Sequence, residues 1–103
     1  MKYSLNNALD LFEAALMKLK GNASPDLLAT VFAEEEKLKQ RINGLSASLR
    51  SQYFTHLSKI DLFLDALKMQ FAYIQPNMLS YQLMFIDTYL SQILPEIELM
   101  RQI

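Results

Sequence analysis

Residues 80–100, SYQLMFIDTYLSQILPEIELM, form a long apolar stretch whose only charges are Asp87, Glu96 and Glu98. Such a stretch could be a membrane anchor, a core helix or a surface for another protein. Asp87, Ser91 and Glu98 recur at intervals of four and seven, opposite a stripe of apolar residues. A helix embedded in lipid has no reason to keep a polar face. The spacing therefore predicts an amphipathic helix and argues against a membrane anchor.

The composition of the whole chain agrees with a helical protein. It has 103 residues, 51% apolar and 20% charged, with a net charge of −1, two glycines, three prolines and no cysteine. A chain with this high an apolar content is not expected to be disordered. Its abundant Leu, Ala, Met, Glu and Lys favour helix. We expect one domain over 1–103. The absence of cysteine rules out disulfides and suits a cytoplasmic protein, and Asp10 and Glu13 make the N-terminus unlike a signal peptide.

Three interruptions divide the chain into helices. They lie at residues 21–25, at Asn43-Gly44 and around Pro76. Ser24, followed directly by proline and aspartate, is typical of a helix start, and Gly44 suits a left-handed helix end. The helices are expected at approximately 5–20, 25–43, 46–75 and 77–102.

Apolar residues recur at spacings of three and four in the first, third and fourth of these segments. The stripes are Leu5, Leu9, Phe12, Leu16 and Leu19; Tyr53, Leu57, Ile60, Leu64, Leu67, Phe71 and Ile74; and Leu79, Leu83, Ile86, Leu90, Ile93, Ile97 and Met100. The sequence thus predicts an all-α fold: a four-helix bundle-like arrangement with two shorter N-terminal helices and a long C-terminal antiparallel helical hairpin.

The second segment has an interrupted stripe. Glu35 stands where the pattern of Leu28, Val31, Leu38 and Ile42 calls for an apolar residue. In one alternative the helix rotates, so that Phe32 is buried and Glu35 stays in water. In the other, a cation pairs with Glu35 at a partly buried contact between helices. An unpaired buried carboxylate is costly, so the rotated helix is the prediction.

The long hairpin carries more apolar side chains than one stripe can bury. At 1.5 Å per residue its helices reach roughly 40 Å, against roughly 25 to 30 Å for the first two, so part of it could be left uncovered. The surplus could enlarge a monomer core, but its Met and aromatic composition favours burial against another chain. The predicted interface residues are Phe63, Met69, Phe71, Tyr73, Met78, Tyr81, Met84 and Phe85.

Catalytic, cofactor and metal sites are not expected. Residues 34–36 are three consecutive glutamates, which point in different directions on a helix and suit a solvated surface. His56 is the only histidine and has no acidic residue three or four positions away, so it suits the edge of a core better than a metal site. We therefore expect a protein that is not an enzyme.

One stretch allows a different function. In residues 38–53 a Gly-Leu-Ser turn lies between two helices with Arg41 and Arg50 nearby, which loosely matches a helix-turn-helix regulator that binds DNA. A net charge of −1 gives little attraction for phosphate. The preferred prediction is a protein-protein interaction module that binds a partner or pairs with itself as a homodimer. Neither a nucleic acid nor a membrane is expected as its partner. Its layout is similar in architecture to small helical chaperones and adaptors.

Overall fold

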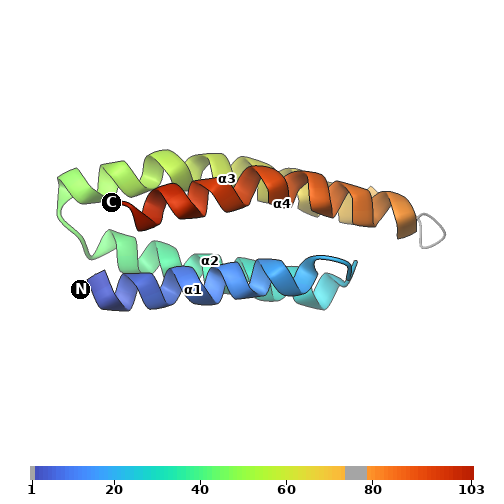
Figure 1. The fold of residues 1–103 in the computed structure, drawn as a ribbon, viewed down its shortest axis with the longest axis horizontal. Coiled ribbons are helices and arrows are strands. Elements are labelled where there is room, and N and C mark those ends of the chain that lie inside the picture. The colour runs from blue at the N-terminus through green and yellow to red at the C-terminus, as the bar shows by residue number, and fades with distance from the viewer. Residues whose placement is uncertain (1, 74–78) are drawn as a thin grey trace.

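The computed structural model describes residues 2–73 and 79–103, and the regular structure of these residues is helical. The helices are α1 (Lys2–Leu19), α2 (Pro25–Asn43), α3 (Ala47–Tyr73) and α4 (Leu79–Arg101). They run alternately up and down an elongated bundle of 47 × 19 × 19 Å (Figure 1). The prediction of an all-α chain with four helices is confirmed.

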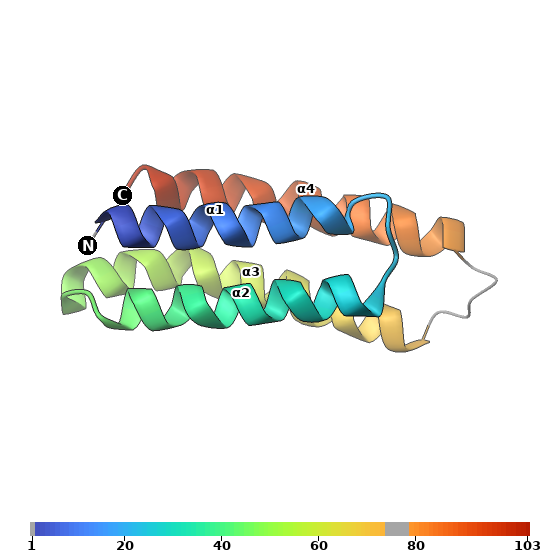
Figure 2. The same cartoon turned by 90° about the horizontal axis from the view of Figure 1, so that it is seen from below.

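The bundle has two layers, α1 with α2 and α3 with α4. The turned view in Figure 2 shows α1 beside α4 and α2 beside α3, so each helix contacts two neighbours. α3 and α4 have 27 and 23 residues, against 18 and 19 in α1 and α2. The longer pair extends beyond the α1–α2 connection (Figure 1). We call residues 68–73 of α3 and 80–85 of α4, which lie toward this extension, the distal end.

The predicted apolar stripes form the core. All of Leu5, Leu9, Phe12, Leu16 and Leu19 are buried, as are Tyr53, Leu57, Ile60, Leu64 and Leu67 on α3 and Ile86, Leu90, Ile93, Ile97 and Met100 on α4. Phe71 and Leu83 are half-buried and pack against this core. Residue 74, and the side chain of residue 79, fall outside what the structure describes.

The ends of the helices differ in part from the prediction. Ser24 caps α2 as expected, because its hydroxyl accepts the Leu27 N–H at 3.4 Å and Pro25 occupies the first turn. The predicted left-handed end at Gly44 is wrong, since Gly44 has φ −81° and ordinary helical geometry. The left-handed residue is Gly21, with φ 77°, which follows α1.

Helix bounds also shift by a few residues. α1 begins at Lys2 rather than near residue 5, and α3 begins at Ala47 rather than 46. The predicted turn around Pro76 lies outside the described residues. Pro95 sits inside α4 with its side chain exposed, away from the core stripe.

Candidate functional site

Half of the predicted interface residues are exposed apolar side chains at the distal end. Met69 and Tyr73 on α3 are 58% and 77% exposed, and Tyr81 and Met84 on α4 are 52% and 53% exposed. Methionine is among the residue types that folding most often buries, and tyrosine is intermediate. We call these four residues the distal apolar surface.

The other predicted interface residues that the structure describes are less exposed to solvent. Phe63 and Phe71 are half-buried and pack against the core, and the Phe63 ring lies 6.2 Å from that of Tyr89, centroid to centroid. Phe85 is also half-buried. Met78 lies outside the described residues. Phe63 and Phe71 therefore contribute mainly to the body of the hairpin, a distinction that apolar spacing alone does not make.

A groove lies between the first turns of α2 and the last turns of α3. Its volume is about 480 Å³, and its lining consists of Pro25, Leu28, Ala29, Phe32, Lys68, Phe71 and Ala72. Lys68 is the only charged residue in that lining, and its Nζ lies 5.7 Å from the centre of the Phe32 ring. The groove thus combines apolar walls with one cation, in the size range of ligand pockets.

The seam between α2 and α3 contains a buried carboxylate, and the predicted rotation of α2 is wrong. Glu35 is only 3% exposed, whereas Phe32 is half-buried. The rejected alternative describes the structure: Lys39 Nζ lies 3.8 Å from Glu35 Oε1 and 3.3 Å from Asp61 Oδ1. The physical reason is that Leu28, Val31, Leu38 and Ile42 all stay buried in this orientation, and Glu35 is carried in with them.

The electrostatics of this seam favour a protonated Glu35. Burial, then the neighbouring Asp61 carboxylate, raises the pKa of Glu35 to about 8, against the partial opposition of Lys39. Burial acts to lower the pKa of Lys39, but Glu35 and Asp61 together raise it above its usual value. The Oε2 atom of Glu35 is buried without a hydrogen-bond partner. The seam is therefore a polar cluster with one unpartnered oxygen inside an apolar layer.

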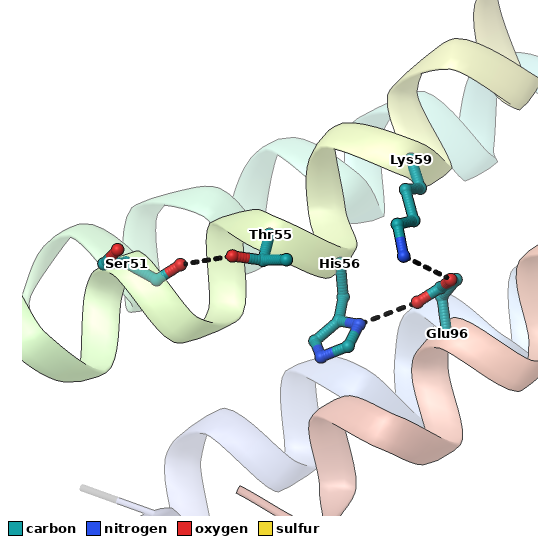
Figure 3. A network of polar contacts seen from close by, with 5 residues as sticks. All are labelled: Ser51, Thr55, His56, Lys59 and Glu96. Atoms are coloured by element: carbon teal, nitrogen blue, oxygen red, sulfur yellow. Dashed lines mark hydrogen bonds and ion pairs between the residues drawn. The ribbon is translucent and has the colours of Figure 1, made fainter.

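A second polar cluster links α3 to α4 (Figure 3). His56 Nδ1 lies 2.7 Å from Glu96 Oε2, and Lys59 Nζ lies 3.6 Å from Glu96 Oε1. His56 and Glu96 are half-buried, in keeping with the prediction of a histidine at the edge of the core. Sequence reasoning missed Glu96 because it looked for partners three or four residues away, and this one is forty away. The cluster can clamp the two helices and orient the imidazole.

Two basic residues near the α2–α3 connection have partners within the protein. Lys37 pairs with Glu34 at 3.4 Å, and Arg50 Nη1 donates to the Asn43 carbonyl at 3.4 Å. α2 and α3 run antiparallel (Figure 1), whereas the helices of a helix-turn-helix cross at a steep angle. The antiparallel arrangement thus differs from the crossing of a helix-turn-helix.

Within residues 2–73 and 79–103, no three His, Cys, Asp or Glu side chains come together so as to hold a metal ion. In the same part of the chain, no helix is both long and apolar enough to cross a membrane. Comparison with protein families, with curated proteins and with solved structures found no match. The candidate site is therefore defined by the geometry of the distal end.

Proposed function

We propose that this protein is a non-enzymatic interaction module, a small helical protein of the chaperone or adaptor kind, that binds a partner or a second copy through an apolar helical face. The observation that supports the proposal is the distal apolar surface, in which Met69, Tyr73, Tyr81 and Met84 are each more than half exposed. Tyrosine and methionine are enriched in interfaces because they bury much apolar area and adapt their shape.

Position-specific crosslinking tests this function. A photo-reactive amino acid is placed at Tyr81, in the distal apolar surface, and as a matched control at Leu11, which is 48% exposed on α1. We expect a discrete covalent adduct in cells from position 81 and none from position 11. The same adduct from both positions, or none from either, would contradict an interface at the distal end.

An apolar fluorescent dye gives an independent readout on the purified chain. Replacing Tyr73 and Tyr81 together by serine should reduce dye emission several-fold, because the dye binds exposed apolar surface. The control replaces Leu11 and Leu99, which are 48% and 44% exposed on other parts of the bundle, by serine. Equal losses in the two double variants would show that the distal end has no special affinity for apolar molecules.

A further inference from the structure

The groove between α2 and α3, which we call the α2–α3 groove, has walls of hydrocarbon. Apart from Lys68, its lining consists of alanine, leucine, phenylalanine and proline, whose side chains neither donate nor accept hydrogen bonds. Contact with such walls removes apolar surface from water and gains nothing for a polar group. The walls therefore suit an alkyl chain.

Lys68 is the group in this lining that can select a ligand by its charge. Its Nζ lies 5.7 Å from the centre of the Phe32 ring, so the ammonium group is held over one apolar wall. Within the described part of the chain, Lys68 forms no ion pair. The nearest acidic residue along α3, Asp65, does not line the groove, and residues 74–78 contain no aspartate or glutamate. The ammonium group can therefore pair with an anion from outside the protein.

The combination of one cation with apolar walls restricts the chemistry of the ligand. A neutral hydrocarbon would give Lys68 no counter-charge, and a ligand with two negative charges would bring one of them to the walls without a partner. An extended peptide would place its amide groups against walls that offer no side chain to hydrogen-bond them. The fit is best for an alkyl chain with a single carboxylate at one end.

The dimensions of the groove set the length of that chain. On α2 the lining runs from Pro25 to Phe32, which is roughly 10 Å at 1.5 Å per residue. The volume of about 480 Å³ is in the range of small-molecule sites. The extended chain of octanoate is about as long as this stretch of α2, so a medium-chain acid matches the groove.

We propose that the α2–α3 groove binds a single-chain carboxylate of medium length, with its carboxylate paired to Lys68 and its alkyl chain against Phe32 and Phe71. The pair joins an ammonium group to a carboxylate, so it is a charge-assisted hydrogen bond. This inference goes beyond the proposed function, because it assigns a small-molecule site to α2 and α3 in addition to a protein-binding surface at the distal end.

NMR with octanoate as the probe tests the location of the site. In a chain whose alanine and methionine methyl groups are isotopically labelled, octanoate should shift the signals of Ala29 and Ala72, which line the groove. The dissociation constant should be below about 1 mM. Met17 and Met84, which are 46% and 53% exposed on α1 and α4, are the reference signals and should shift little. Equal shifts at the reference signals, or none at the two alanines, would overturn the proposal.

A lysine variant tests the ion pair. Lys68→Gln should weaken the binding of octanoate about fivefold and leave the binding of 1-octanol unchanged, because the alcohol has the same chain without the charge. Lys18→Gln is the matched control: Lys18 is exposed on α1 and, among the residues that the structure describes, has no ion-pair partner either. Equal losses for the acid and the alcohol, or no loss for either, would show that Lys68 does not pair with the carboxylate.

Filling the groove tests the apolar walls. Ala72→Phe adds a large side chain to the lining at an exposed position, so it should block octanoate and abolish the shift at Ala29. Ala14→Phe makes the same change at an exposed position of α1 and should leave binding intact. Circular dichroism verifies that both variants remain folded. Undiminished binding to folded Ala72→Phe would place octanoate elsewhere and overturn the proposal, whereas the crosslinking result at Tyr81 does not depend on this outcome.

Discussion

At the scale of single residues, the most informative side chain is Glu35. Its carboxylate lies among Leu28, Val31, Leu38 and Ile42 on the buried face of α2, with Lys39 reaching it from one turn away. Burial disfavours the ionised form of this carboxyl group more than the attraction of Lys39 favours it, so the group holds its proton up to about pH 8. The free energy of unfolding should therefore depend strongly on whether Glu35 is protonated.

This dependence gives the first prediction. The pKa of Glu35 in the folded protein is about 8, above the ordinary value of 4.5 for a glutamate. Between these pH values the native state binds more protons than the unfolded state, so the free energy of unfolding falls as the pH rises. From about pH 5 to about pH 8 the wild type should lose roughly 1 to 3 kcal/mol more than Glu35→Gln. Urea unfolding at the two pH values measures the difference.

Glu36→Gln is the control for that experiment. Glu36 is the next residue of α2 and its side chain is exposed, so this variant should keep the pH dependence of the wild type. If Glu35→Gln also keeps it, the carboxylate of Glu35 is solvated and the buried seam is not present in solution.

At the scale of elements, the two glycines that end α1 and α2 differ in backbone geometry. Gly21 has φ 77°, which residues with a Cβ adopt only with strain, whereas Gly44 has φ −81°. A Cβ at Gly21 would meet nothing within 4 Å, and one at Gly44 would meet only the Arg41 carbonyl at 3.5 Å. The backbone conformation, rather than steric room, therefore distinguishes the two positions.

The second prediction follows from this contrast. Gly21→Ala should lower the free energy of unfolding by about 1 kcal/mol, through strain in the left-handed conformation. Gly44→Ala should raise it by about 0.5 kcal/mol, because alanine restricts the unfolded chain and fits the native backbone. Urea unfolding of the two variants serves as a reciprocal control. Equal effects of the same sign would show that the two turns have the same backbone conformation.

The same elements show how far a sequence can predict this structure. Apolar spacing located the helices and the core stripes, because a helix turns by a constant angle and only one face can be buried. It did not locate the left-handed turn, since Asn43-Gly44 and Gly21-Asn22 are both compatible with one. It also predicted the wrong environment for Glu35, because spacing along α2 does not reveal Asp61, which contacts Lys39 from α3. The long-range pair of His56 with Glu96 was invisible for the same reason.

At the scale of the whole molecule, the two layers are joined beyond their apolar contact by Arg101 near the end of α4. Its guanidinium lies 2.6 Å from Asp10 and 3.4 Å from Glu13, both on α1, and 3.4 Å from Glu98 on α4. A network of several charges with a fork-shaped arginine contributes more than an isolated exposed pair. Arg101 therefore fixes how the C-terminal hairpin sits against α1.

The third prediction concerns this network. Arg101→Ala should lower the free energy of unfolding by about 1 kcal/mol, and the loss should shrink at high salt because the charges are partly exposed. Lys37→Ala removes an ion pair between neighbouring turns of α2 and should change stability by less than about 0.5 kcal/mol. Chemical denaturation at low and high ionic strength measures both. A loss that is independent of salt would assign the effect of Arg101 to packing of its aliphatic stem.

The placement of the chain ends has a mechanical consequence. α1 begins and α4 ends at the same end of the bundle, and the two helices lie side by side (Figures 1 and 2). A pulling force applied between these ends would separate α1 from α4 one turn at a time. The Arg101 ion pairs would carry the force first. Side-by-side helices pulled from opposite ends would share the load over their whole length. The bundle should therefore yield to tension at low force, and its distal end should be the last part disturbed.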